Sequence, residues 1–201
     1  TDVVRFLGKV LFCLCTLGLL EPMMTSAASE TPGDPRAPRT LLFGGDFRSE
    51  LWRIVDDVVM GGISRSRLTT TREATGLFAG KLSLENNGGF ASARTMLDTR
   101  IDLSAFSGLE IRVRGDGKIF QLRLRTDREF DGIAYRARFT TERDSWVTIR
   151  IPFSAFEPTF RGRTPEGAPP LNVSGIQQLG FLIADGQQGD FRLEVGWVRV
   201  Y

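Results

Sequence analysis

Apolar and polar residues alternate with a period of two along most of the chain after residue 40. In residues 109–114 every second residue is apolar and those between are charged. A similar spacing recurs in residues 120–125, 135–139, 146–151 and 191–195. Because the side chains of a strand point alternately to its two faces, each segment predicts a strand with one buried and one solvated face.

Three local features add detail to this strand pattern. Gly115, Asp116 and Gly117 separate the first two segments, which predicts a hairpin over residues 109–125. Gly196 predicts a bulge after the last segment. Residues 181–184 are apolar without interruption, which fits a strand that is covered on both faces.

No segment after residue 40 keeps a helical period over a dozen residues. Many short strands separated by glycine and proline turns are typical of two antiparallel sheets packed face to face. The chain has 201 residues, enough for one such domain with a real core. We therefore predict an all-β fold, with one antiparallel β-sandwich over residues 40–201.

The beginning of the chain has the layout of a secretory signal peptide, which we predict for residues 1–28. Arg5 and Lys9 precede an apolar run over residues 10–20, and small residues follow at 25–28. The apolar run is short for a membrane span. This pattern predicts an exported protein, periplasmic or extracellular.

Two alternatives remain for this leader. It could stay uncleaved as an anchor, which would then be the protein's membrane contact. It could also be a mitochondrial presequence, although Asp2 and Glu21 disfavour one because such segments avoid acidic residues. Residues 29–39 are rich in proline and polar residues and predict a flexible linker.

Composition narrows the chemistry that the chain can perform. It has no histidine, and Cys13 and Cys15 both lie in the apolar run of the leader. These absences exclude Ser–His and Cys–His nucleophiles and histidine metal sites. The balance of 26 basic and 24 acidic residues gives no argument for nucleic acid. We predict no enzyme, no cofactor, no metal site and no nucleic-acid partner.

Paired carboxylates, as in glycoside hydrolysis, are the catalytic option that composition leaves. Asp56 and Asp57 are neighbours, so in a strand they face opposite sides and cannot flank one bond. Asp127, Asp131 and Asp185 lie beside glycines or turns, where acidic residues usually fix the backbone. We therefore assign no catalytic residue. A structural calcium ion on Asp56, Asp57 and Asp185 is left open.

Residues 52–66 hold the most distinctive motif of the chain. Paired glycines between an apolar run and a polar segment indicate a turn, and an acidic residue beside it commonly binds backbone N–H groups. We expect Met60 in the core and a hairpin turn at 86–90 that returns Phe90 to the core. The motif residues, with those of the second turn, are Trp52, Asp57, Met60, Gly61, Gly62, Ser64, Asn87, Gly88, Gly89 and Phe90.

Arginine is abundant at the polar positions of the central strands. If these strands are neighbours in one sheet, their guanidinium groups and Trp146 share a face that could bind an acidic ligand or a sugar ring. The candidate ligand residues are Arg112, Arg114, Gln121, Arg123, Arg125, Arg136, Arg138 and Trp146. The alternative is a solvated face on which carboxylates such as Glu110 pair with the arginines.

The segment 156–170 predicts a long loop rich in proline and glycine. Long loops of this kind often bind partners. Phe160, flanked by Arg161 and Arg163, is the candidate anchor. The alternative is that Phe160 packs onto its own sandwich.

The ordered motifs also resemble a known family. Trp52, Asp57, Met60–Gly62 and Ser64 are followed by Asn86–Ser92 and Arg94. Further matching segments lie at 114–125, 134–139, 146–163 and 179–185. Together they look like the signature of the complex I intermediate-associated protein 30 family, over nearly all of the chain after the leader.

The resemblance implies a jelly-roll β-sandwich similar to galactose-binding domains. It also implies a non-enzymatic assembly helper that acts on a protein partner, with a subunit of a membrane complex as the candidate, because the family's best-known members help to assemble respiratory complex I. The family offers no agreed catalytic residues. The alternative function is a carbohydrate-binding module that uses the arginine-rich face, with a glycan as its ligand.

Overall fold

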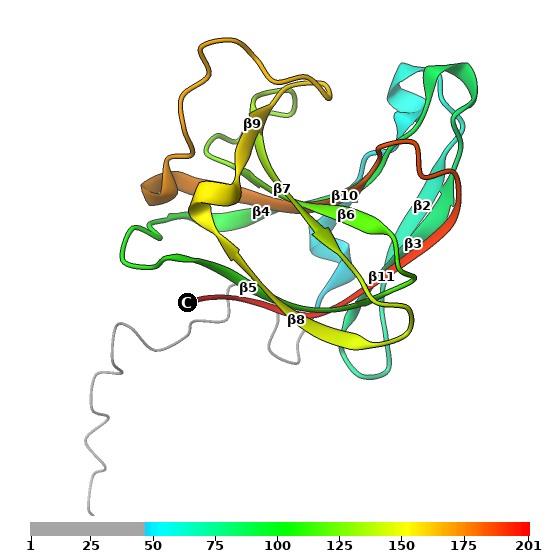
Figure 1. Ribbon diagram of the computed structural model, residues 1–201, viewed down its shortest axis with the longest axis horizontal. Helices are drawn as coiled ribbons and strands as arrows, with labels where there is room; N and C mark the ends of the chain where they lie inside the picture. The colour runs from blue at the N-terminus through cyan, green and yellow to red at the C-terminus, as the bar shows by residue number, and fades with distance from the viewer. Residues whose placement is uncertain (1–46) are drawn as a thin grey trace, which may run out of the picture. The chain divides into compact units, whose positions relative to one another are not determined.

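The computed structural model describes residues 47–201, which form a sandwich of two antiparallel sheets (Figure 1). The six-stranded sheet has the order β1 (Trp52–Ile54), β4 (Ala91–Ile101), β10 (Ile176–Ile183), β6 (Ile119–Arg125), β7 (Ala134–Thr140) and β9 (Glu157–Thr159). The five-stranded sheet has the order β2 (Arg65–Thr70), β3 (Gly76–Leu82), β11 (Gly189–Val200), β5 (Gly108–Gly115) and β8 (Trp146–Pro152). The predicted all-β antiparallel sandwich is confirmed.

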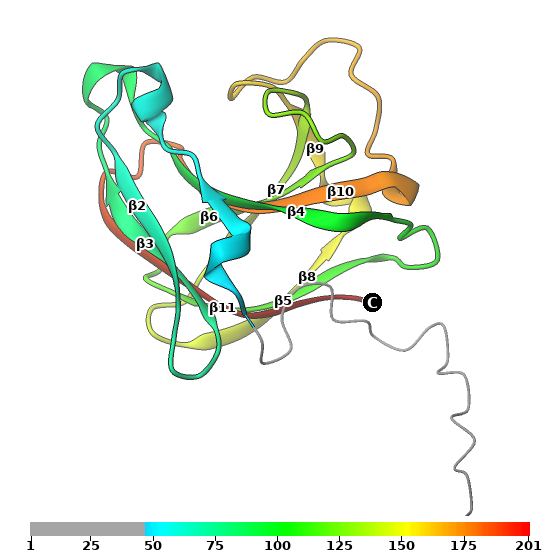
Figure 2. The ribbon, with the colours of Figure 1, turned by 180° about the vertical axis from the view of Figure 1, so that it is seen from behind.

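Short 3₁₀ turns join several of these strands. They are η1 (Ser49–Leu51), η2 (Asp57–Met60), η3 (Glu85–Asn87), η4 (Phe153–Ala155) and η5 (Val173–Gly175). Seen from behind, η2 and η3 lie together beyond one end of β2 and β3 (Figure 2). None of the helical segments in residues 47–201 is long and apolar enough to cross a membrane. The predicted leader, 1–28, and linker, 29–39, lie outside the described residues.

The core lies between the inward faces of the two sheets. Phe78 of β3, Phe120 of β6 and Phe181 of β10 are fully buried there, and Trp52 stacks on Phe181 with ring centroids 5.9 Å apart. These inward residues are the apolar members of the alternating segments, because one face of each strand must leave water for the sheets to pack. The second half of β10 is buried on both faces, as the continuous apolar sequence of residues 181–184 predicts.

The bulge predicted at Gly196 is confirmed, since the register of β11 against β5 shifts between Val195 and Trp197. The predicted hairpin over 109–125 is wrong. The strand β5 pairs with β11 and β8, whereas β6 pairs with β10 and β7 in the other sheet. Gly115–Gly117 therefore lies at a crossing between sheets. Alternation defines the two faces of a strand but not its partner, so it cannot distinguish a crossing from a hairpin.

Candidate functional site

A buried carboxylate organises one end of the sandwich. Asp57, at the start of η2, is fully buried and accepts bonds from Ser64 N at 2.9 Å and Ser64 Oγ at 2.5 Å. It also accepts from Gly89 N at 2.7 Å and Phe90 N at 3.3 Å. Ser64 Oγ in turn accepts from Ser83 N at 2.9 Å. One side chain thus holds together η2, the start of β2 and the loop that follows η3.

The electrostatics of Asp57 follow from these contacts. Burial alone would raise the pKa of its carboxyl group, because the charged form loses water. The bonds from Ser64, Gly89 and Phe90 favour the charged form and lower the pKa below its ordinary value. The neighbouring Asp56 binds Ser66 N at 2.7 Å and Ser66 Oγ at 2.6 Å, yet burial raises its pKa.

The two paired glycines of the motif are required for different physical reasons. Gly61 has a φ of +92° and open space around it, whereas a Cβ on Gly62 would lie 2.4 Å from Asp57 Cγ. We expect Gly62→Ala to lower the free energy of unfolding by about 3 kcal/mol, since Asp57 is fixed and cannot move aside. Gly61→Ala should cost about 1 kcal/mol for its left-handed backbone. Urea unfolding followed by tryptophan fluorescence measures both variants, and equal losses would contradict this explanation.

Two residues expected in the core lie elsewhere. Met60 is 58% exposed, at the end of η2, and Phe90 is only half-buried. The expected hairpin at 86–90 is instead the turn η3 and a loop that leads from β3 to β4 in the other sheet. Because Asp57 binds Gly89 N and Phe90 N, the backbone of this loop is held against η2 and the Phe90 side chain is directed away from the core.

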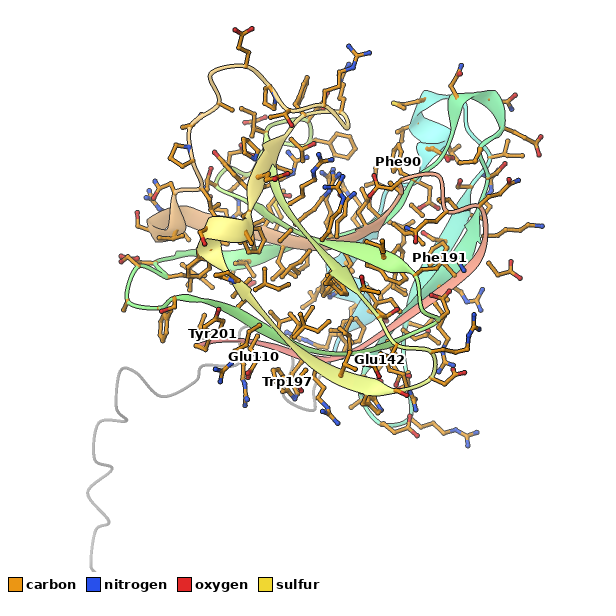
Figure 3. The ribbon with its side chains drawn as sticks, in the orientation of Figure 1. Phe90, Glu110, Glu142, Phe191, Trp197 and Tyr201 are labelled. Atoms are coloured by element: carbon orange, nitrogen blue, oxygen red, sulfur yellow. The ribbon has the colours of Figure 1, made fainter. Side chains whose placement is uncertain are left out.

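These side chains line a groove over the outer face of the six-stranded sheet, with a volume of about 510 Å³. One wall contains Val55, Val59, Met60 and Phe90, and the floor contains Arg94, Arg123, Arg125 and Leu182. The opposite wall contains Phe130, Asp131, Gly132, Thr159 and Arg161. Figure 3 shows Phe90 on this side of the molecule, and Glu110, Trp197 and Tyr201 on the opposite side.

The floor arginines are held by neutral acceptors. Arg123 Nη2 donates to Gln121 Oε1 at 3.0 Å, and Arg125 Nη1 donates to the Gly132 carbonyl at 2.8 Å. Arg94 Nη1 donates to the Phe130 carbonyl at 2.9 Å, and its guanidinium lies over the Phe130 ring, 4.2 Å from the centroid. These bonds fix the direction of each guanidinium, and none of the three guanidinium groups forms a direct ion pair with a carboxylate of residues 47–201.

The pKa values of the floor arginines reflect their burial and the charges around them. Burial, together with the charges of Arg125 and Arg136, lowers the pKa of Arg123 to about 10. Burial and the charges of Arg125 and Arg53 lower the pKa of Arg94. Burial lowers the pKa of Arg125, although the nearby charges of Asp127 and Asp131 oppose this effect. All three guanidinium groups remain charged at neutral pH but at an energetic cost.

The structure divides the predicted arginine face between two sheets. Gln121, Arg123, Arg125, Arg136 and Arg138 lie on the outer face of the six-stranded sheet. Arg112, Arg114 and Trp146 lie on the outer face of the five-stranded sheet, because β5 and β8 belong to it. The expected single face with Trp146 beside Arg123 is therefore wrong, and the reason is the missing hairpin between β5 and β6.

On the five-stranded sheet several arginines have carboxylate partners, whereas Arg112 Nη1 donates to the Thr148 hydroxyl group at 3.1 Å. Arg114 pairs with Glu194 at 2.7 Å, and Arg150 and Arg199 pair with Glu110 at 2.9 Å and 2.5 Å. Both glutamates are buried, at 2% and 5% exposure. The Arg114 guanidinium lies over the Trp146 ring, with its central carbon 5.0 Å from the ring centroid. This surface matches the solvated, ion-paired alternative that the sequence left open.

The proposed partner loop begins with a tight turn. Phe160 and Arg163 exchange backbone hydrogen bonds at 2.8 Å and 3.0 Å. Arg161 forms an ion pair with Asp131, and its guanidinium lies 5.2 Å from the centroid of the Phe160 ring. Phe160 is 36% exposed. Of the three loop residues, Arg161 lines the groove, while Phe160 and Arg163 lie beside it.

The acidic residues that were considered as candidates for catalysis or metal binding contact other residues of the fold and not one another. Asp185 pairs with Arg138 at 3.1 Å and accepts from Gln121 Nε2 at 3.1 Å. Within residues 47–201, no three acidic side chains gather into a group that could hold a metal ion. The one carboxylate among the groove residues, Asp131, is paired with Arg161.

Sequence reasoning missed several groove residues. Arg94, Phe130 and Asp131 were not among the candidate ligand residues, although Arg94 alternates with the buried Ala91, Ala93 and Thr95 of β4. That alternation is the signal that would have placed Arg94 on an outer face. No local pattern indicates Phe130 and Asp131, because they reach the groove from the loop between β6 and β7.

The fold is a two-sheet β-sandwich with a groove over the outer face of the six-stranded sheet. The model of the complex I intermediate-associated protein 30 family matches residues 41–195, and the chain belongs to this family. An uncharacterised protein of Schizosaccharomyces pombe is 34% identical over 79% of this chain and 82% of its own length. Complex I intermediate-associated protein 30 of Mus musculus, named as mitochondrial, is 28% identical over 75% of this chain but 52% of its own length. The chain thus spans about half of that relative.

Solved structures agree on the fold. The family 11 carbohydrate-binding module of a cellulosomal cellulase from Clostridium thermocellum has a TM-score of 0.58 and 16% identity, over 81% of this chain and 93% of that module. A family 30 module from the same organism has a TM-score of 0.54 and 14% identity, over 81% of this chain and 97% of that module. These likenesses support the jelly-roll fold and do not define a ligand.

The predicted export of the protein is corrected by these comparisons. Relatives from mouse, Drosophila melanogaster and Caenorhabditis elegans are all named as mitochondrial proteins, which conflicts with a periplasmic or extracellular location. The prediction rested on a basic start, a short apolar run and small residues. That combination is not specific enough to define a compartment, since several targeting segments combine basic and small residues.

Proposed function

We propose that this domain is a non-enzymatic assembly helper that holds a protein partner, a subunit of a respiratory membrane complex, in the groove over the six-stranded sheet. The groove itself carries the proposal. Its wall combines Val59, which is 64% exposed, with Met60 and Phe90, and exposed apolar side chains beside polar ones are typical of protein-binding surfaces. The names of the mitochondrial relatives support the choice of partner.

The groove offers little for the alternatives. Hydrolysis needs two carboxylates across a cleft, and the described lining has one, which is already paired. Glycan modules commonly place aromatic rings against sugars. The rings in the described lining are Phe90 and Phe130, and the Phe130 ring is already covered by Arg94. Trp146, the candidate for stacking a sugar, lies on the other sheet. A glycan is therefore the less supported ligand.

The test is to delete the gene in its own organism and to measure assembled complex I by native gel electrophoresis. Without the chain, we expect the assembled complex to fall at least about threefold and subassemblies to accumulate. The wild-type chain should restore assembly, whereas Val59→Asp with Met60→Asp should not, because two charges in the apolar wall oppose docking. An unchanged complex in the deletion strain would overturn the proposal.

A matched control separates the groove from general effects of added charge. Leu51→Asp with Ile119→Asp changes two other exposed apolar side chains, at 54% and 41% exposure, that do not line the groove. This variant should restore assembly like the wild type. If both double variants fail equally while remaining folded, the groove is not the docking site.

A further inference from the structure

The floor of the groove has an unusual charge balance within the described part of the chain. Arg94, Arg123 and Arg125 on the floor, and Arg136 beside it on β7, all lack a carboxylate within ion-pair distance among residues 47–201. In addition, Arg136 Nε is buried without a hydrogen-bond partner there. On the other sheet, Arg114, Arg150 and Arg199 are each paired with a buried glutamate. Direct ion pairs therefore neutralise these three arginines of the five-stranded sheet, but not the arginines of the groove floor.

The arginines that lack a direct ion pair are close together and fixed in place. Arg123 lies directly opposite Arg136 in the pairing of β6 with β7, and Arg125 is its neighbour on the same face. Gln121, which accepts from Arg123, is oriented by its own bond to Asp185. Like charges held at this density repel one another, so an anion that enters the groove would relieve a cost that the folded protein already bears.

The side chains of the groove walls restrict which class of anion could bind there. A flat lipid surface cannot reach arginines at the bottom of a groove that has walls on both sides. A nucleic acid would bring phosphates to the floor, but among the aliphatic side chains of Val55, Val59 and Met60 the wall offers its bases one ring, Phe90. The Phe130 ring opposite is already covered by Arg94. A peptide with alternating acidic and apolar side chains can satisfy both surfaces, since successive side chains of an extended peptide point in opposite directions.

We propose that the groove binds an extended peptide segment in which acidic residues contact Arg94, Arg123 and Arg125, and apolar residues contact the wall formed by Val55, Val59, Met60 and Phe90. This inference rests on the proposed function and names the chemistry of the partner segment. Guanidinium groups bind carboxylates through charge-assisted hydrogen bonds, often two at once, which gives specificity for the acidic positions. The apolar wall gives the remaining affinity.

The probes are short fluorescein-labelled peptides, titrated with the full chain and followed by fluorescence anisotropy. One peptide alternates glutamate and leucine, a second replaces each glutamate with glutamine, and a third replaces each leucine with serine. We expect the first to bind at least about tenfold more tightly than either of the others, and its affinity to fall as salt is raised. Equal binding of the glutamate and glutamine peptides would overturn the inference.

The matching protein variant is Arg123→Gln with Arg125→Gln. It should weaken binding of the glutamate–leucine peptide at least about tenfold, because two charge-assisted contacts are lost. The control, Arg67→Gln with Arg143→Gln, removes two exposed arginines outside the groove and should change binding less than about twofold. A single-stranded oligonucleotide that binds more tightly than the peptide would overturn the choice of a peptide.

Thermal unfolding distinguishes binding from a structural role. Since the floor arginines repel one another, Arg123→Gln with Arg125→Gln should leave Tm unchanged or raise it. A clearly lowered Tm would mean that these arginines hold the fold together, and would overturn the inference. If the peptide fails to bind while the Val59→Asp, Met60→Asp variant still blocks assembly in cells, the inference fails and the proposed function stands.

Discussion

Replacing Asp57 with alanine is expected to lower the free energy of unfolding by about 3–5 kcal/mol, a large share of the total for a domain of this size. The variant would leave the N–H groups of Ser64, Gly89 and Phe90 in a buried place without their acceptor. It would also remove the acceptor of the Ser64 hydroxyl and leave a small void. Urea unfolding followed by tryptophan fluorescence measures the loss.

Asp56 provides the matched control for this prediction. It is the adjacent carboxylate, it also accepts two bonds from one serine, and it is only half-buried. Asp56→Ala should therefore cost about 1 kcal/mol, because water can replace the acceptor. If both substitutions cost the same, burial of Asp57 is not the source of its contribution.

Asp57 also couples the stability of the fold to the shape of the groove. The wall residues Met60 and Phe90 belong to two separate segments, which meet because one carries Asp57 and the other donates two N–H groups to its carboxylate. Weakening this bond should loosen the wall before the sheets separate. The motif thus acts on the groove through the backbone, while most of its polar members remain buried.

The alternation of the sequence was sufficient to predict five of the strands, β5, β6, β7, β8 and β11, and their inward faces. Phe120, Leu122 and Leu124 are buried as expected, because a sheet that packs on another must place its apolar face inward. The pairing of strands could not be obtained in this way. Residues 109–125 read as a hairpin, yet hydrogen-bond partners are chosen by long-range packing between β5, β8 and β11 that no local pattern encodes.

The arrangement of the candidate site could be predicted only in part, for the same reason. Arg123 and Arg125 were identified by their alternation with buried leucines, which is a local property. Their separation from Arg112 and Arg114 depends on which sheet each strand joins, which is not local. Met60 was expected in the core because it follows two valines, but η2 lies beyond the end of the sheets, where no second layer covers it.

The free energy of unfolding of the domain should also depend strongly on pH in the acidic range. Three buried carboxyl groups have lowered pKa values: in Asp57 and Glu194 hydrogen bonds outweigh the opposing effect of burial, and in Glu110 the bond from Arg150 is the largest cause. A lowered pKa means that the unfolded chain binds the proton more readily. The stability from these groups is therefore complete above their ordinary pKa values of 3.8 and 4.5, and is lost as the pH falls through the lower folded values.

Asp56 acts in the opposite direction, because its pKa is raised and its folded carboxyl group binds a proton more readily than the unfolded one. Each proton taken up on unfolding contributes up to about 1.4 kcal/mol per pH unit. The free energy of unfolding, measured in urea from about pH 6 down to about pH 3, should thus decline most steeply below about pH 4.5. Glu194→Gln should make the decline shallower and Asp56→Asn should make it steeper. Opposite signs for two neutralising substitutions are difficult to obtain from a general effect of net charge, so the same sign for both would contradict the assignment of these buried groups.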